Sequence, residues 1–392
     1  MFGATTTATV NASGNSELNG GSSYLCVPHS FDRLFNSTIS TKSVLATATT
    51  TSPNTAVGMF SRALRARLYE PMQIGSVTVR SRVLQAPLSG VTDRTFRRLV
   101  RRFAPESMTY TEMVNARELC HLRQLDKILD VDPDEQLLSV QLFDSRPDFI
   151  GAAARMAVEH GALTVDINMG CPVNKITRKG GGSSLLRQPD LAARLVDAAV
   201  AAVNVPVTVK TRLGWSDDEI EIVEFARRLE TAGAQMLTVH ARTRSQGYTG
   251  AARWEWLARV KASISIPLIA NGDIVSVATA ARCLEQTGAD GVMCSRGTLG
   301  NPFLVGDIDR WLRFGEREPI RSPQEYLVLA KEHLIGLQSA KGDRGVRQAR
   351  KHMAWYARNF CEAAKLRELL AQLESVEDGL RLLDASIEHL DQ

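Results

Sequence analysis

Short apolar segments rich in β-branched residues alternate with amphipathic segments along most of this chain, beginning near residue 83. Each apolar segment is followed by a polar turn and then by about ten to fifteen residues whose apolar positions recur at three- and four-residue spacing, the period of a helix. Eight such segments occur, at 83–88, 108–114, 137–143, 164–169, 207–213, 236–242, 267–273 and 291–296. Near-continuous apolar strands indicate a parallel sheet that is covered on both faces.

Eight strand–helix units over roughly 215 residues predict an α/β fold, a (β/α)8 or TIM barrel. A doubly wound open sheet is the alternative, but the G-x-G-x-x-G turn expected after its first strand is missing. The alternation stops after Pro319, beyond which two helices are expected, at 323–340 and 345–390. The chain is therefore divided into a barrel, 68–318, and a small all-helical C-terminal domain, 319–392.

Residues 1–58 differ from the rest, because they include 20 Ser or Thr and only four charged residues. A segment so poor in charge and apolar periodicity is predicted to be disordered. Its Ser/Thr richness with few acids is typical of a plastid transit peptide. An over-extended start is the alternative, since a sensible sequence begins at Met59, and both interpretations stay open.

The 392 residues are 44% hydrophobic and 23% charged, with a formal net charge of +4, which is the composition of a globular protein. No run of 18 apolar residues is present to span a bilayer, so we expect no membrane association. The six cysteines lie singly, without the spacing of a zinc site or a disulfide framework. We therefore expect no metal and a cytoplasmic location, or a plastid location if residues 1–58 are a transit peptide.

Polar side chains end six successive predicted strands. The active site of a (β/α)8 barrel lies at the carboxyl ends of its strands, so these residues are expected to meet at one mouth. One polar strand end alone carries little information, but six in succession favour a functional site. The residues are Gln141, Asp166, Asn168, Cys171, Lys210, Arg212, His240, Arg242, Asn271, Asp273, Ser295 and Arg296.

The last two predicted strands close with Asn271-Gly272-Asp273 and Ser295-Arg296-Gly297. Glycines leave backbone N–H groups open, and Arg296 adds a fixed positive fork, which is the usual composition of a barrel phosphate site. A phosphate held there would place a flat cofactor across the mouth, with Lys210 opposite to donate to an electron-rich ring position.

Cys171 follows a strand directly, in Asn168-Met169-Gly170-Cys171-Pro172. A buried structural cysteine is the commoner case, and Cys120, Cys283 and Cys294 are assigned to it. Cys171 differs because it stands at the mouth. A thiol with a pKa near ~8.5 is mostly protonated at neutral pH, so Cys171 is a candidate proton donor as well as a nucleophile.

These motifs resemble those of the tRNA-dihydrouridine synthases, specifically their B-type bacterial branch, over about residues 68–390. The marks are 86–93 (Ala-Pro-Leu-Ser-Gly-Val-Thr-Asp), 140–142, 166–172, 209–212, 240–243, 271–274 and the tail motif 349–356. The resemblance implies a flavin-dependent oxidoreductase that reduces a uridine of tRNA to 5,6-dihydrouridine, with FMN as cofactor and NADPH re-reducing the flavin. It also implies that Cys171 is the catalytic acid.

The FMN contacts that the resemblance implies are Pro87, Leu88, Ser89, Gln141, Lys210, His240, Asn271, Gly272, Asp273, Ser295 and Arg296. Two motifs depart from the family, which commonly has Met-Ala at Leu88-Ser89 and Gly at Ser295. Ser295 keeps its backbone N–H but adds a hydroxyl in a tight place.

The tRNA contacts are expected from basic residues near the mouth and on the tail. Arg178 and Lys179 lie next to the glycines at 180–182, and Arg347, Arg350 and Lys351 belong to a tail segment with six basic residues and one acid. Arg94, Arg97, Arg98, Arg101 and Arg102 form a second basic segment, for which a solvated surface is the preferred interpretation.

Two other functions remain open from the residues alone. Lys210 could be the amine of a Schiff-base lyase, and the chain could bind tRNA without catalysis. A monomer is expected whichever function applies.

Overall fold

A computed structural model describes residues 62–121, 125–132 and 134–390, so the predictions for residues 1–58 lie outside the described residues. Its main sheet is a barrel of parallel strands in the order β3-β11-β10-β9-β8-β7-β6-β4. The Gln85 N–H donates to the Met108 carbonyl (3.0 Å), which joins β3 to β4 and closes the circle. The strands are β3 Val83–Gln85, β4 Thr109–Tyr110, β6 Leu138–Phe143, β7 Thr164–Met169, β8 Val207–Arg212, β9 Leu237–His240, β10 Leu268–Asn271 and β11 Gly291–Cys294.

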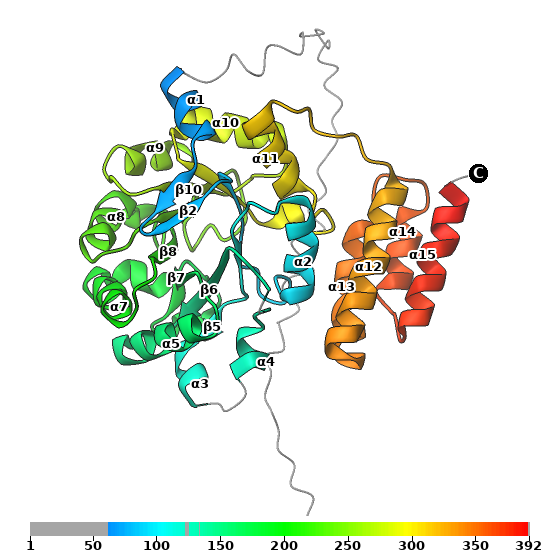
Figure 1. Cartoon of the computed structure of the whole chain (residues 1–392), viewed down its shortest axis with the longest axis horizontal. Coiled ribbons are helices and arrows are strands. Elements are labelled where there is room, and N and C mark those ends of the chain that lie inside the picture. The colour runs from blue at the N-terminus through cyan, green and yellow to red at the C-terminus, as the bar shows by residue number, and fades with distance from the viewer. Residues whose placement is uncertain (1–61, 122–124, 133, 391–392) are drawn as a thin grey trace, which may run out of the picture. The chain divides into compact units, whose positions relative to one another are not determined.

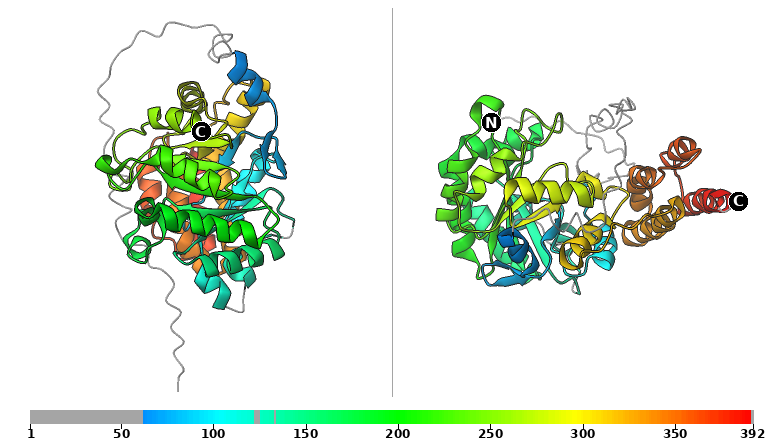
Figure 2. Two further views of the ribbon diagram at one scale, coloured as in Figure 1. Left: turned by 90° about the vertical axis from the view of Figure 1, so that its left-hand side faces the viewer. Right: turned by 90° about the horizontal axis from the view of Figure 1, so that it is seen from above.

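Helices follow the strands and cover the outside of the barrel, as the views in Figure 1 and Figure 2 show. The predicted (β/α)8 fold is thereby confirmed. Local signals start and stop these helices: Ser276 and Thr279 form a capping box at α10, and Gly288 ends it in the left-handed region. The barrel helices are α2 Arg94–Phe103, α3 Ala116–His121, α4 Leu125–Leu129, α5 Pro147–Glu159, α6 Asn174–Thr177, α7 Pro189–Ala202, α8 Ile222–Thr231, α9 Glu255–Lys261, α10 Val277–Thr287 and α11 Leu304–Phe314, with 3-10 turns at Gly182–Arg187 (η2), Asp217–Glu219 (η3) and Arg296–Thr298 (η4).

The prediction of a single strand at 108–114 is wrong in detail, because the structure divides this segment into β4 and β5 (Val114–Asn115). Between them the Gln141 N–H donates to the Thr111 hydroxyl (3.1 Å) instead of a backbone carbonyl, so a side chain interrupts the ladder.

The sequence also did not predict the first elements, α1 (Arg62–Tyr69) and the hairpin of β1 (Met72–Ile74) and β2 (Val77–Val79). Apolar side chains of this hairpin pack with those in or next to the barrel strands into one buried cluster that includes Tyr110 and Met236.

The C-terminal region contains four helices rather than the two predicted: α12 Pro323–Lys341, α13 Asp343–Tyr356, α14 Ala363–Leu370 and α15 Val376–Leu390. The expected helix at 345–390 breaks because Asn359 and Glu362 adopt left-handed backbone conformations (φ 63° and 64°). Gly342 separates α12 from α13 as expected, whereas Gly345 lies inside α13, where a Cβ would stand 2.0 Å from the Leu337 carbonyl oxygen.

The four C-terminal helices share a hydrophobic core that also takes in Leu99 of α2 and Phe303. Within the described residues, no helix has the length and apolar character that crossing a membrane requires.

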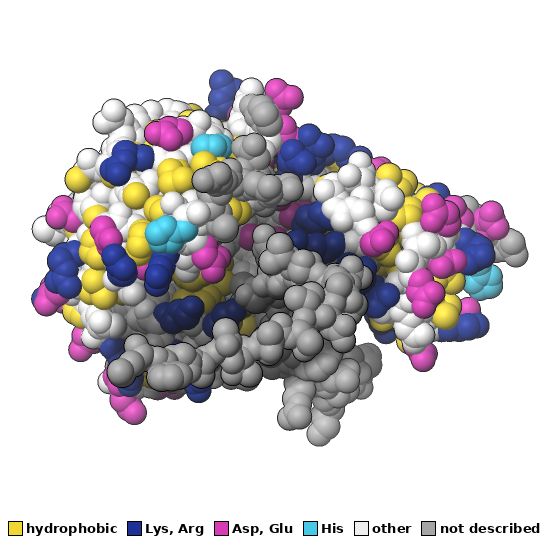
Figure 3. Space-filling model, turned by 90° about the horizontal axis from the view of Figure 1, so that it is seen from below, with side chains coloured by type: hydrophobic (Ala, Val, Ile, Leu, Met, Phe, Trp, Pro, Cys, Tyr) yellow, Lys and Arg dark blue, Asp and Glu magenta, His cyan; other side chains and the backbone are white. Residues whose placement is uncertain are grey.

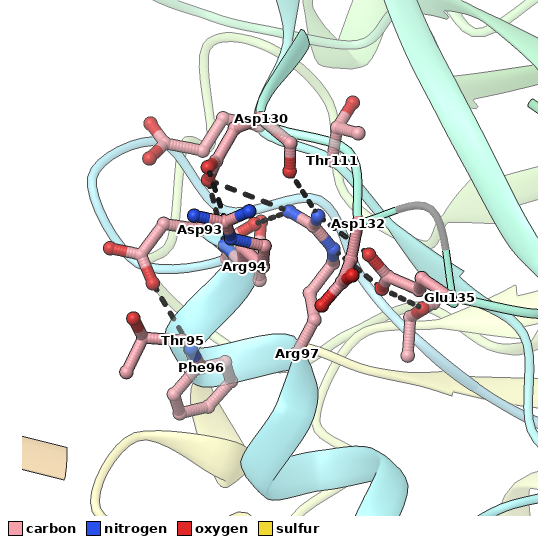
Figure 4. A network of polar contacts seen from close by, with 12 residues as sticks. Asp93, Arg94, Thr95, Phe96, Arg97, Thr111, Asp130, Asp132 and Glu135 are labelled. Atoms are coloured by element: carbon pink, nitrogen blue, oxygen red, sulfur yellow. Dashed lines mark hydrogen bonds and ion pairs between the residues drawn. The ribbon is translucent and has the colours of Figure 1, made fainter. Parts of the chain in front are cut away.

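The arginines of α2 have structural partners, as Figure 4 shows for Arg94 and Arg97. Arg97 is fully buried and binds both carboxylate oxygens of Glu135 (2.8 Å each). Its remaining N–H groups donate to the carbonyls of Thr92 (2.9 Å) and Asp130 (2.5 Å). The preferred interpretation of a solvated surface is therefore wrong for Arg97, which ties α2 to the segment before β6.

Replacing Arg97 with alanine should lower the free energy of unfolding by about 3–5 kcal/mol, because the buried Glu135 carboxylate loses its partner. Arg102→Ala is the control, since its pair with Glu332 is half-exposed and should contribute at most about 1 kcal/mol. Urea denaturation of both variants measures the difference. Equal losses of unfolding free energy in the two variants would show that burial does not strengthen the Arg97–Glu135 pair.

Candidate active site

A chain of side-chain hydrogen bonds runs from β7 to β6, back to β7 and on to β8. The Asn168 amide donates to Gln141 Oε1 (2.8 Å), and Gln141 Nε2 donates to Asp166 Oδ2 (2.7 Å). Thr208 donates to the other oxygen of Asp166 (2.6 Å). Burial raises the pKa of Asp166 to about 6, while the bonds from Gln141 and Thr208 oppose the rise. The chain fixes which way the Asn168 amide faces.

Asn168 in turn orients the loop that carries Cys171. Its Oδ1 accepts the backbone N–H groups of Gly170 (3.2 Å) and Cys171 (2.9 Å). On the far side of the loop, the Cys171 carbonyl accepts the Ser183 N–H (3.0 Å). Gly182 has a φ of +59°, and a Cβ there would lie 2.7 Å from the Cys171 oxygen, so only glycine permits this close packing.

The thiol of Cys171 is partly buried at the mouth. Burial raises the pKa of Cys171 above its usual range, and the nearby Arg212 and Lys210 offset part of the rise. The group is therefore a protonated thiol at neutral pH, the form that a proton donor needs.

A second group of bonds joins β8, β10 and β11. Lys210 Nζ donates to Asn271 Oδ1 (3.1 Å), and Asn271 Nδ2 donates to the Met293 carbonyl and to Ser295 Oγ (2.9 Å each). Burial, then repulsion from Arg212, lowers the pKa of Lys210 to about 8. The structure thus brings Lys210, Asn271 and Ser295 together, as expected for one binding site.

The glycine predicted in the phosphate loop meets a backbone requirement. Gly272 has a φ of +115°, and a Cβ would stand 2.9 Å from Cδ2 of His240. Asp273 follows in the left-handed region (φ 58°), and its carboxylate binds Arg242 (2.8 Å) and the Ala252 N–H (2.8 Å). The Asp273 side chain is therefore held by protein groups.

Positive charge accumulates around this loop. Arg296 lies 3.7 Å from Asp273 Oδ1, so two arginines share one carboxylate. Burial lowers the pKa of Arg296, and the charge of Arg242 lowers it further. A bound anion would relieve this repulsion.

His240 is buried beside the same cations. Burial, followed by Arg212, Lys210 and Arg242, lowers its pKa well below the usual range, so the ring is neutral. Arg242 approaches His240 Nε2 (3.4 Å) and can only donate, which places the imidazole proton on Nδ1.

Two residues at the mouth have roles that sequence analysis missed. Tyr248 had no assigned role, yet the guanidinium groups of Arg296 and Arg212 lie 4.8 and 5.4 Å from its ring centre. Arg212 donates to the carbonyls of Gly170 (2.8 Å), Thr243 (3.1 Å) and Gly247 (2.8 Å), so it joins the loop after β7 to the loop after β9. Only the position of Tyr248 in the loop after β9 could have indicated it.

The loop after β3 contains the first expected cofactor contacts, Pro87, Leu88 and Ser89. The Leu88 carbonyl accepts the N–H groups of Val91 and Thr92 (3.0 Å each), which makes a tight turn. Ser89 is exposed, and β3 pairs with β11, so this turn lies next to the loop of Ser295 and Arg296.

The expected RNA-binding residues differ in their surroundings. Arg178, Lys179 and Arg347 are exposed. Arg350 donates to the Leu373 carbonyl (2.7 Å), so it also supports the C-terminal core, and Lys351 Nζ lies against Gly90. Figure 3 shows Lys and Arg side chains spread over the face that it displays, with Asp and Glu side chains among them. Among the described residues, no group of three His, Cys, Asp or Glu is arranged to hold a metal ion.

Comparison with known proteins identifies the family of this chain. The family model for dihydrouridine synthase (Dus) matches residues 84–391. A probable tRNA-dihydrouridine synthase 1 of Synechocystis sp. is 63% identical over 318 residues, which cover 81% of this chain and 90% of the relative. The tRNA-dihydrouridine synthase B of Pseudomonas aeruginosa is 42% identical over 309 residues, covering 78% and 92%.

Among solved structures, histamine dehydrogenase from Rhizobium sp. 4-9 aligns with a TM-score of 0.50 at 16% identity, over 70% of this chain and 51% of that chain, a likeness of fold alone. The sequence matches confirm the resemblance stated above. The chain belongs to the dihydrouridine synthase family.

Proposed function

We propose that this protein reduces specific uridines of tRNA to 5,6-dihydrouridine, with FMN as its bound cofactor and NADPH as the reductant. The observation that carries the proposal is the joint arrangement of a protonated Cys171, oriented by Asn168, and a cationic glycine loop across the same mouth. The family membership supports the reaction, and the residues of this chain support the cofactor.

The residues present fit FMN. Backbone N–H groups at Gly272 and Asp273, together with Arg296, suit a phosphate dianion, which compensates the excess of cations there. Lys210 on β8 is held by Asn271, the residue directly before Gly272, so it lies beside this loop and not opposite it as the sequence suggested. Its ammonium would donate to an electron-rich atom of a flavin ring. Gln141, already bonded at both ends of its amide, would contact the ring from β6.

When bound, reduced FMN supplies the hydride that uracil accepts at C6. Negative charge then develops toward C5 and O4, and Cys171 gives its thiol proton to C5, which completes reduction of the C5=C6 bond. The charges of Arg212 and Lys210 stabilise the thiolate that remains. Neutral His240, with its low pKa, has no imidazolium proton to give and instead binds the cofactor or the uracil edge.

The uridine must leave the stacked tRNA to reach this mouth, at a cost of a few kcal/mol. Arg178 and Lys179, exposed beside the Cys171 loop, and Arg347 on α13 are proposed contacts to tRNA phosphates. A cytoplasmic location and a monomeric state stay predictions. Family membership argues against the two alternative functions, a Schiff-base lyase and a non-catalytic tRNA-binding module. The chain belongs to a family that is named for catalysis of dihydrouridine synthesis.

The phosphate loop predicts that the apoprotein binds FMN more tightly than riboflavin, which lacks the phosphate. Arg296→Met should raise the Kd for FMN about tenfold or more, the scale of a charged hydrogen bond, and leave the Kd for riboflavin nearly unchanged. Quenching of flavin fluorescence measures both constants. Arg227→Met, which removes an exposed arginine of α8, is the control. Equal loss for both flavins in Arg296→Met would contradict the phosphate assignment.

Cys171→Ala should slow reoxidation of the reduced flavin by tRNA by roughly 10²-fold or more, because C5 loses its proton donor. FMN content, reduction by NADPH and tRNA binding should stay unchanged. Cys171→Ser should be nearly as slow, since an alcohol is a weaker acid than a thiol. Single-turnover flavin absorbance gives the rate, with Cys361→Ala, an exposed cysteine, as control. A parent-like rate in Cys171→Ala would move the acid to another group.

A further inference from the structure

Helix α13 contacts both barrel loops to which the proposed flavin residues belong. The first loop, 87–93, follows β3 and includes Leu88 and Ser89, and the second, 295–300, follows β11 and includes Arg296. Because β3 and β11 are neighbours in the barrel, one helix can reach both loops. Figure 1 draws α13 on the side of the barrel where α2 lies.

In the first contact, hydrogen bonds hold both the N–H and the carbonyl of Gly90. Its N–H donates to Glu112 Oε2 (2.5 Å), and its carbonyl accepts His352 Nε2 (2.8 Å) and Gln348 Nε2 (3.4 Å) from α13. Gly90 has a φ of +69° and belongs to the tight turn that begins at Leu88. Fixing the Gly90 peptide therefore fixes the turn that presents Leu88 to the mouth.

The hydrogen bond from His352 has only one possible direction. A carbonyl can only accept, so Nε2 of His352 carries the proton and its Nδ1 accepts from His333 Nε2 (3.4 Å). His333 Nδ1 then accepts from the Tyr356 hydroxyl (3.1 Å). Burial lowers the pKa of both histidines, so neutral rings relay the bonds from Tyr356 to the barrel loop.

The end of the same loop is held by Asp93. One oxygen of Asp93 caps α2 through the Phe96 N–H (3.0 Å), and the other accepts Lys341 and Gln348 Nε2 (2.9 Å) from the C-terminal helices. Nearby charge and hydrogen bonding from Lys341 outweigh burial and lower the pKa of Asp93, so the carboxylate stays charged.

The second loop meets the other end of α13. Gly300 has a φ of +61°, and a Cβ there would lie 2.3 Å from the Trp355 carbonyl oxygen, so the backbones are in direct contact. Arg358 donates to the carbonyls of Leu299 (3.5 Å) and Gly300. The loop connects back to the phosphate site because the Thr298 N–H donates to the Ser295 carbonyl (3.0 Å).

We propose that α13 is a brace for the cofactor site, in which His352 and Gln348 are positioning residues that hold the loop after β3 against the loop after β11. The C-terminal domain then serves flavin binding as well as tRNA binding. This inference rests on the proposed FMN-dependent function, but it concerns the free protein and needs neither tRNA nor NADPH.

The test is the Kd for FMN of the full-length apoprotein, measured by fluorescence quenching without tRNA. His352→Phe keeps the ring volume but removes the donor, and it should raise the Kd about five- to tenfold, the scale of one hydrogen bond. His352→Gln, which still offers an amide donor, should stay within about twofold of the parent. Leu383→Ala is the matched control, because it loosens the core of the C-terminal helices without touching either loop.

Hydrogen exchange provides a second readout, since amides of residues 88–93 should exchange faster in His352→Phe than in Leu383→Ala. Gln348→Leu gives the same comparison if His352→Phe does not fold. A folded His352→Phe that binds FMN as tightly as the parent, or an equal rise in Leu383→Ala, overturns the brace. A parent that binds no FMN overturns the proposed function itself, whereas tight binding by parent and variants alike overturns the brace alone.

Discussion

Positive charge at the barrel mouth is the constraint on which the site depends. Arg242 and Arg296 share the Asp273 carboxylate, while Lys210 and Arg212 stand close enough to lower the pKa of buried His240. Such charges are costly to bury unless an anion balances them. The mouth is therefore suited to an anionic cofactor, and burial together with these charges keeps His240 neutral.

Arginines that lie in similar basic segments of the sequence have different roles in this chain. On α2, Arg97 is buried with Glu135 and supports the fold, while Arg102 pairs with Glu332 on α12 and links barrel to tail. On α13, exposed Arg347 remains available to a polyanion, whereas Arg350 bonds the chain near α15. Partner and burial, rather than local density of charge, distinguish the structural arginines from those that can meet RNA.

The barrel and the residues of its mouth were predictable because both follow from local periodicity. Alternating apolar strands and helices identify the fold, and strand ends then bring Cys171, Lys210 and Asn271 to one face without knowledge of their distances. The interruption at Thr111 was not predictable, because it depends on a side-chain bond to Gln141 on another strand.

In the C-terminal domain, too, contacts between residues far apart in the sequence could not be predicted. The bond from His352 to Gly90 joins residues 262 positions apart, and helical periodicity assigned His352 no role. The helix break near Asn359 depends on left-handed backbone that the sequence there, without glycine, did not signal. Roles at Tyr248 and His352 follow from packing between loops, which periodicity does not encode.

The central claim is that this chain adds two hydrogens to uridine in tRNA. Its most direct test is mass-spectrometric mapping of an unmodified tRNA transcript after incubation with the purified protein, FMN and NADPH. The account predicts that one or a few uridines gain the mass of two hydrogens, and that omitting NADPH abolishes the gain. A transcript unchanged in mass, with flavin-loaded protein that NADPH reduces normally, would contradict it.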